Sequence, residues 1–205
     1  MAKTGDSSPY NAAQSPSLIT LVRRARDGNQ SAFEALYALY NDPISRYLSR
    51  MVGNDGVGCE LTQETFLKAW LSLPGLREPE RFVGWLYRIA SNCAYDYQKR
   101  TRHIQVIPLE TYTGGDALSV SGPEESIEEV ELLKLALALV PRIYRECLIL
   151  YEIEELPQRQ IAELVHIKEA SVSKYVSRGK EKLRQMYYQL VREQNSALAQ
   201  GRRGQ

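Results

Sequence analysis

QIAELVHIKEASVSKYVSRGKEKLRQ, residues 160–185, is the stretch that decides the fold class. Apolar residues at helical spacing end at Ile167, and the segment that follows carries basic residues on its outer positions. Two short helices, the second of them basic, are typical of a helix-turn-helix, whose second helix enters the DNA major groove. A solvated basic helix in an ordinary bundle is the alternative that this stretch alone leaves open.

Each part of a helix-turn-helix over 158–177 has a candidate residue. Ala162 is small enough for two helices to cross, and His166 lies where the turn requires a positive φ. The residues expected to form the core of the pair are Ile161, Leu164, Ile167, Val172 and Val176. The candidate DNA-binding residues are Ser171, Ser173, Lys174, Tyr175, Arg178 and Lys182. The early ones would reach base edges or phosphates, and the later bases would reach phosphates, which give affinity without sequence information.

Charge is segregated along the chain, although the formal net charge of the 205 residues is only +1. Residues 104–131 contain seven acidic residues and no Lys or Arg. Residues 168–192 contain seven basic residues against two acidic ones. This asymmetry indicates a nucleic-acid surface near the C-terminus and a separate acidic connector before it.

Composition argues against several classes of protein. The three cysteines, Cys59, Cys93 and Cys147, are widely spaced, so we expect reduced thiols and no disulfide framework. With only two histidines in the chain we expect no metal site, and we expect no cofactor. Neither a secretory signal nor a run of eighteen apolar residues is evident, so we expect a cytoplasmic protein that does not enter a membrane.

Helical periodicity covers most of the remaining sequence, and no strand-like alternation interrupts it. Gly28 is expected to end a first helix, and a capping box at 31–34 is expected to open the next. Residues 53–58 are rich in Gly and Asn and are predicted to form a turn. Helices are then expected over 60–73 and 82–102.

The expected fold class is all-α, with two helical domains joined by a flexible acidic linker. A second capping box at 126–129 opens a helix that runs to Leu139, and another helix is expected over 143–153. The expected divisions are a disordered N-terminus 1–16, a front domain 17–103, the linker 104–126, a rear domain 127–192 and a flexible tail 193–205.

Two surfaces of the front domain are candidates for binding. Glu60, Gln63 and Glu64 are predicted to point outward, and they are either simply solvated or form a docking face for a basic partner helix. Trp85 and Tyr95 lie on the 82–102 helix, which has a basic end. Aromatic rings mixed with cations suit single-stranded nucleic acid, because bases stack on the rings while the cations follow the backbone. The alternative for Trp85 is a position in the core, and this is the interpretation that we favour for it.

Several blocks of the chain carry a family resemblance. They are ARDGNQSAFEALYALY (25–40), ELTQETFLKAW (60–70), RFVGWLYRIASNCAYDYQKR (81–100), LALALVPRIYRECLILYEIEELPQRQIAELVHI (135–167) and SVSKYVSRGKEKLRQ (171–185). In this order and spacing the chain resembles a bacterial RNA polymerase sigma factor of the sigma-70 type. It is most similar to the extracytoplasmic-function (ECF) subfamily, which keeps only regions 2 and 4. The resemblance covers about residues 17–103 and 127–190.

The resemblance implies a function: binding core RNA polymerase and directing promoter recognition, DNA melting and transcription initiation, with no enzymatic activity. The residues implied to dock on the β′ clamp helices are Glu60, Leu61, Gln63, Glu64 and Leu67. Those implied to recognise and open the −10 element are Arg77, Arg81, Trp85, Arg88, Asn92, Tyr95, Lys99 and Arg100. The helix-turn-helix would read the −35 element as duplex DNA.

The resemblance also implies further partners, namely the β flap of the polymerase and an anti-sigma factor, and a monomer when the chain is free. In the family a Ser usually caps the recognition helix. Lys168 replaces it here, so this helix is expected to lack a side-chain N-cap.

Two other classes of protein remain as alternatives. A one-component, dimeric helix-turn-helix regulator would need a ligand pocket or a dimerisation helix, and the 60–64 block would have no purpose in it. An enzyme would need a phosphate-binding loop, a nucleophile elbow or metal-ligand spacing, and the sequence shows none of these.

Overall fold

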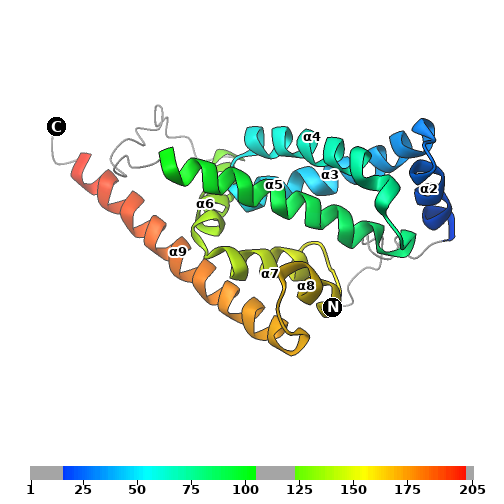
Figure 1. Cartoon of the computed structure of the whole chain (residues 1–205). Helices are drawn as coiled ribbons and strands as arrows, with labels where there is room; N and C mark the ends of the chain where they lie inside the picture. The colour runs from blue at the N-terminus through cyan, green and yellow to red at the C-terminus, as the bar shows by residue number, and fades with distance from the viewer. Residues whose placement is uncertain (1–15, 105–122, 202–205) are drawn as a thin grey trace.

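The computed structural model describes residues 16–104 and 123–201, and the described elements are helices (Figure 1). The front body consists of α2 (Pro16–Arg26), α3 (Gln30–Val52), α4 (Asp55–Ser72) and α5 (Phe82–Ile104), with two short 3-10 turns between α4 and α5. The rear body consists of α6 (Pro123–Leu139), α7 (Arg142–Glu152), α8 (Gln158–Val165) and α9 (Val172–Gly201), with a 3-10 turn at 169–171. The all-α prediction is confirmed.

The start of α3 differs from the expected capping box. Asn29 is the N-cap, and its side chain accepts a hydrogen bond from the backbone N–H of Ala32 at 2.8 Å. The helix therefore begins before Ser31, so the predicted capping box at 31–34 is wrong. Asn is among the best N-cap residues, and Gly28 directly before it has a φ of +91°, as expected for a glycine that ends α2.

The predicted turn at 53–58 is also mostly wrong. Gly53 does end α3 in the left-handed conformation, but Asn54 then caps α4, and its side chain accepts from the N–H of Val57 at 2.9 Å. The other two glycines that suggested a turn, Gly56 and Gly58, lie inside α4. Gly58 is buried where a Cβ would lie 2.8 Å from the backbone Cα of Ser49, so the glycine allows α3 and α4 to approach closely.

The rear body contains the predicted helix-turn-helix. α8 and α9 are joined through His166, which has a φ of +57° and so adopts the left-handed conformation expected from the sequence. Lys168 precedes the 3-10 turn at 169–171 without a side-chain capping bond, as expected. Of the predicted core, Ile161, Val172 and Val176 are buried, while Leu164 and Ile167 are half-buried.

Two helices extend past the domain boundaries predicted from the sequence. α6 already begins at Pro123, inside the predicted linker, and α9 continues to Gly201, inside the predicted tail. The predicted N-terminal segment 1–15, the linker at 105–122 and the last residues, 202–205, lie outside the described residues. The predicted capping box at 126–129 cannot be assessed, because the side chains of 123–128 also lie outside them.

The two bodies pack against each other, with α6 beside α3 and α8 beside α5. One buried apolar cluster contains residues of both, among them Leu86 of the front body and Ile149 of the rear body. In Figure 1, α7 and α8 lie below the layer formed by α3, α4 and α5, α6 stands upright at the left end of that layer, and α9 runs along the outside of α6 and α7. This arrangement determines which of the candidate surfaces face solvent.

Candidate nucleic-acid interface

The first candidate surface follows one side of α4. Glu60 and Gln63 are exposed, and Glu64 is partly exposed and pairs with Lys68 at 2.7 Å. Leu67 is 60% exposed, a large value for an apolar side chain with no neighbour to cover it. An exposed leucine between polar groups is typical of a protein–protein contact rather than of a solvated face.

Two residues change the composition of this surface. Leu61 is only 4% exposed and belongs to the core, so its predicted place in the docking surface is wrong for its side chain in this structure. Leu71 is 70% exposed and lies one helical turn beyond Leu67, a spacing of four that the sequence already contained. We call Glu60, Gln63, Glu64, Leu67 and Leu71 the docking strip.

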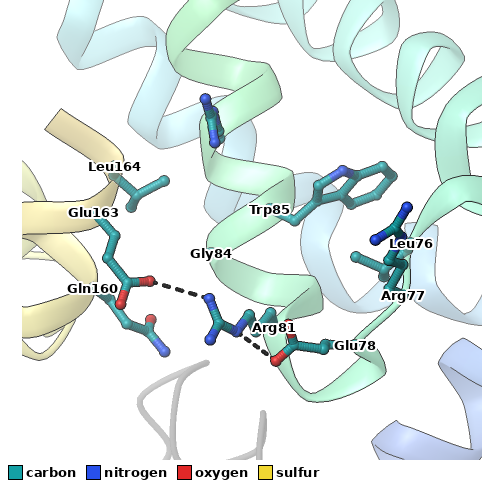
Figure 2. A pocket seen from close by; sticks show the side chains of 10 residues that line it. Leu76, Arg77, Glu78, Arg81, Gly84, Trp85, Gln160, Glu163 and Leu164 are labelled. Carbon is teal, nitrogen blue, oxygen red and sulfur yellow. Dashed lines mark ion pairs between the residues drawn. The ribbon is translucent and has the colours of Figure 1, made fainter. Parts of the chain in front are cut away.

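The second candidate surface surrounds a cavity of about 220 Å³ between the two bodies (Figure 2). Four predicted residues of the front body line it, and we call them the α5 face: Arg77, Arg81, Trp85 and Arg88. Trp85 is half-buried and packs against the ring of Phe82 at 5.9 Å between centroids. One part of the indole is therefore packed and another lines the cavity, while the binding role of Trp85 stays a prediction.

The opposite wall of the cavity belongs to α8, the first helix of the helix-turn-helix. Gln160, Glu163 and Leu164 line it, and Figure 2 shows them across from Arg81 and Trp85. Arg81 forms two ion pairs, one with Glu78 at 2.8 Å and one with Glu163 at 3.7 Å. One of the predicted DNA-binding cations is thus bound to a carboxylate of the rear body.

The remaining predicted residues of α5 lie further along the helix. Asn92, Lys99 and Arg100 are exposed. Tyr95 is 43% exposed, and the guanidinium of Arg142 from α7 lies 4.3 Å from the centre of its ring. The structure therefore places all eight predicted residues on or beside one side of the front body, with the rear body touching Arg81 and Tyr95.

The third candidate surface is the exposed side of α9 near its start. Ser173, Lys174 and Arg178 are exposed, and we call these three residues the recognition face. Ser173 donates to Gln158 at 3.3 Å, and Arg178 donates to the hydroxyl of Tyr144 at 3.4 Å. Both contacts are at the surface, so both side chains can exchange them for contacts with DNA.

Other predicted residues of this helix are less available. Tyr175 is half-buried, and its ring packs against that of Tyr144 at 5.4 Å between centroids, so much of the ring serves the fold. Lys182 is half-buried and donates to Gln185 at 3.0 Å, and Ser171 is half-buried in the turn before α9. The position of the side chain around the helix, which periodicity indicates only coarsely, explains these differences.

A shallow groove of about 470 Å³ lies between α6 and α9, and no sequence argument predicted it. Apolar residues from both helices line it, with Val130 48% exposed, Leu133 47% exposed and Tyr188 57% exposed. Lys180 and Arg184 lie at its border. The groove has the size and character of a helix-binding site.

Two general findings complete the description of the surfaces. In residues 16–104 and 123–201 no group of three or more His, Cys, Asp or Glu side chains is placed to hold a metal ion. Over the same residues none of the helices combines the length and the apolarity needed to span a bilayer.

Comparison with known families agrees with both halves of the architecture. The family described as Sigma-70 region 2 matches residues 36–104, and the family described as Sigma-70, region 4, matches residues 131–183. The chain is a sigma factor of the sigma-70 family. The two matches together cover more than half of the sequence, and they divide it as the front and rear bodies do.

Curated relatives place this sigma factor in the ECF group. It is 28% identical over 173 residues to the ECF RNA polymerase sigma factor SigW of Bacillus subtilis, covering 80% of this chain and 92% of the relative. It is 29% identical over 182 residues to the ECF RNA polymerase sigma-E factor of Escherichia coli strain K12, covering 84% of this chain and 95% of the relative.

Two solved structures share the fold. CnrH, in complex with the cytosolic domain of CnrY, superposes with a TM-score of 0.64 at 22% identity, covering 83% of this chain and 96% of that one. RpoE of Bartonella quintana, in complex with the anti-sigma factor NepR, superposes with a TM-score of 0.60 at 20% identity, covering 75% and 95%.

The chain is therefore a transcription initiation factor that binds core RNA polymerase and recognises promoters, and it is not an enzyme.

Proposed function

We propose that this sigma factor divides promoter recognition between its two bodies: the front body docks on the polymerase and opens the −10 element, while the rear body reads the −35 element as duplex. The rear body carries a helix-turn-helix, which needs an intact major groove. The α5 face combines an indole with cations, which suits separated strands. Captured bases then offset the few kcal/mol that unstacking costs.

In this proposal the docking strip binds the β′ clamp helices of the polymerase. The single observation that carries the assignment is the exposure of Leu67 and Leu71 at 60% and 70%, next to the polar groups of the same helix face. Burying two leucines at an interface stabilises a complex by roughly 1.5–3 kcal/mol each where coverage is complete. The groove between α6 and α9 is proposed to receive the β flap.

Holding both bodies on one polymerase raises the effective concentration of each DNA contact, so neither body needs to bind tightly alone. The donors Lys174 and Arg178 on the recognition face suit both DNA phosphates and the acceptor atoms of guanine in the major groove. By analogy with the NepR complex of RpoE, we propose regulation by an anti-sigma factor, with the free chain a cytoplasmic monomer.

The docking assignment is tested with the variant Leu67→Ala with Leu71→Ala and, separately, with Gln63→Ala with Glu64→Ala. Each pair is expected to lower affinity for core polymerase, with the leucine pair losing about 10-fold or more because two apolar contacts are removed. Fluorescence anisotropy with labelled sigma factor measures the affinity. Leu39→Ala, which truncates a 57% exposed leucine on α3, is the control. Equal binding by all three variants would exclude the docking strip.

A further inference from the structure

A side-chain hydrogen bond links the two helices of the helix-turn-helix behind the recognition face. Gln158 is the first residue of α8, and its Oε1 atom accepts a hydrogen bond from the Ser173 hydroxyl of α9 at 3.3 Å. Gln158 is half-buried, whereas Ser173 is exposed. The contact therefore connects a partly packed residue of the first helix to the surface that is proposed to meet DNA.

The core of the helix-turn-helix determines how far apart these two side chains lie. Ile161, one turn after Gln158, and Val172, directly before Ser173, are both fully buried. His166 adopts the left-handed conformation and sets the path of the chain between the two helices. Because packing holds the backbone on both sides, the amide and the hydroxyl stay within reach of each other.

The direction of this hydrogen bond decides what Ser173 can offer to DNA. A serine hydroxyl has one proton and two lone pairs. When the proton is donated to Gln158, only acceptor sites remain, and Ser173 can accept from DNA without losing its contact with Gln158. In the major groove adenine and cytosine present an amino donor, whereas guanine and thymine present acceptors, for which this hydroxyl has no proton left.

The other two residues of the recognition face cannot make this distinction. Lys174 and Arg178 carry only donors, which suit phosphates and the acceptor atoms of guanine. Arg178 already donates to the hydroxyl of Tyr144 at 3.4 Å. Of the three residues that form the recognition face, Ser173 is therefore the one that can accept a hydrogen bond from an amino group of a base.

We infer that Gln158 is a positioning residue for promoter recognition: it takes the hydroxyl proton of Ser173, so that Ser173 selects a base with an amino group, adenine or cytosine, at one position of the −35 element. This role rests on the −35 function proposed for the recognition face, to which it adds the class of base read at one position. Contact with DNA excludes water from the hydrogen bond and strengthens it. A hydroxyl that is oriented in advance also loses less conformational freedom on binding.

The test uses the full chain bound to core polymerase and a promoter library in which each −35 position is randomised. The parent is expected to prefer adenine or cytosine over guanine and thymine by about 3-fold or more at one position, the size of effect that a single hydrogen bond provides. Ser173→Ala should remove the preference at that position and leave the other positions unchanged. Sequencing of the bound promoters measures the preference.

Substitutions of Gln158 distinguish positioning from a structural role. Gln158→Met keeps the length of the side chain but offers only a weak acceptor, so the Ser173 hydroxyl can then donate as well as accept, and the preference should fall to near equality. Gln158→Glu keeps an acceptor and should keep the preference, although its charge lowers the affinity for every promoter alike. Gln30→Met, at an exposed position of α3 that donates to Glu34 at 3.0 Å, is the matched control.

Several results would overturn the role of Gln158. An unchanged preference in Ser173→Ala or in Gln158→Met would do so, as would a parental preference for guanine or thymine at the position that Ser173 reads. Loss of the preference in Gln158→Glu would show that acceptance of the proton is not what matters. A uniform loss of affinity in Gln158→Met, with the preference retained, would assign Gln158 to the fold alone.

A separate variant distinguishes failure of this role from failure of the proposed function. Lys174→Ala with Arg178→Ala removes the cations of the recognition face and leaves Gln158 and Ser173 in place. If this pair weakens −35 duplex binding while Ser173→Ala changes no preference, the recognition face binds DNA and only the role of Gln158 is wrong. If neither variant has an effect, the proposed −35 role is wrong as well.

Discussion

The two proposed DNA surfaces of this sigma factor differ in what covers them. On the front body, Arg81 and Tyr95 are engaged by Glu163 and Arg142 of the rear body. On the rear body, Lys174 is exposed, and Arg178 has only a surface contact. The rear body thus engages two of the residues proposed to hold single strands. The residues proposed to read duplex make only surface contacts within their own body.

The difference is physically reasonable. A surface with an exposed indole and several cations would bind any single-stranded nucleic acid, because stacking on a ring depends little on sequence. The contacts of the rear body with Arg81 and Tyr95 reduce what a strand can reach in the free protein. A helix that contacts intact duplex through phosphates binds weakly and reversibly on its own, so it needs no cover.

The largest expected effect comes from locking the bodies together. A Cβ built on Gly53 would lie 2.7 Å from the Cβ of Ala138, while disulfide-bonded Cβ atoms lie roughly 3.8 Å apart, so a bridge requires a shift of about 1 Å. Gly53 has a φ of +73°, so a cysteine there also strains the backbone, and the reduced variant controls for that strain. We expect Gly53→Cys with Ala138→Cys, oxidised in a Cys59→Ser background, to lose promoter-dependent transcription almost completely. Reduction should restore it, because the two bodies are then free to separate.

In vitro transcription with core enzyme, before and after addition of a thiol reductant, measures this effect. Binding of −35 duplex by the oxidised protein is the internal control, and it should equal that of the reduced protein. Full transcription by the locked protein would show that the two bodies need not separate for initiation. The contacts between the bodies would then have no effect on promoter opening.

An intermediate effect is expected on the exposed surface. Lys174→Ala with Arg178→Ala should weaken −35 duplex binding and reduce the slope of log affinity against log salt by about 1.8, since each phosphate contact contributes about 0.9. Titrations at several salt concentrations, with open and locked protein alike, provide the slope. Arg24→Ala with Arg26→Ala, on α2, removes the same charge and should leave the slope unchanged. A parental slope in the α9 variant would exclude these two contacts.

The smallest effect is a pH dependence of closure, by which we mean the packing of the two bodies on each other. Glu154, in the loop between α7 and α8, accepts a hydrogen bond from the Tyr87 hydroxyl of α5 and is only 6% exposed. Burial raises the pKa of the Glu154 carboxyl, against the opposing hydrogen bond from Tyr87 and the charges of Arg50 and Arg46. When the bodies separate, this carboxyl returns to water and to its ordinary pKa, so the closed state binds a proton more tightly than the open one. Closure is therefore strongest below the ordinary pKa and weakens as pH rises through the raised value.

We accordingly expect a larger closed fraction at about pH 5 than at about pH 8, measured with spin labels on Leu39→Cys and Glu181→Cys in a Cys59→Ser background. The groups that face Glu154 from α3 and α5 are Arg46, Arg50 and Tyr87. Glu154→Gln cannot titrate and should show no such change. The same pH response in that variant would assign it to another group.

Local features of the fold could be predicted from the sequence, and the predictions that were wrong also concern local features. The helix-turn-helix was predictable because its turn, its small crossing residue and its apolar positions lie within about twenty residues, and His166 adopts the expected positive φ. The start of α4 was missed, because Asn54 caps the helix and the glycines after it were read as a turn. Gly58 serves close packing of helices, which a glycine count does not reveal.

The candidate surfaces were predictable to the level of the helix face. The family resemblance pointed to faces of α4, α5 and α9, and their roles stay predictions. Leu61 is buried and Leu71 exposed, since a period of 3.6 residues gives the orientation of a helix only approximately. The contacts of Glu154 and Glu163 could not be predicted. Their partners are distant in the sequence, and a single acidic residue in an exposed-looking loop carries no signal of its own burial.

The exposed thiol of Cys59 makes the docking strip directly observable. It neighbours Glu60 on α4, while Cys93 and Cys147 are buried, and burial raises the pKa of both of these thiols, that of Cys147 to about 12. Because the thiolate is the reactive form, an alkylating reagent should modify Cys59 alone in the native protein. The rate of that modification therefore offers a chemical footprint of polymerase occupancy, obtained from the unaltered sequence without any engineered label.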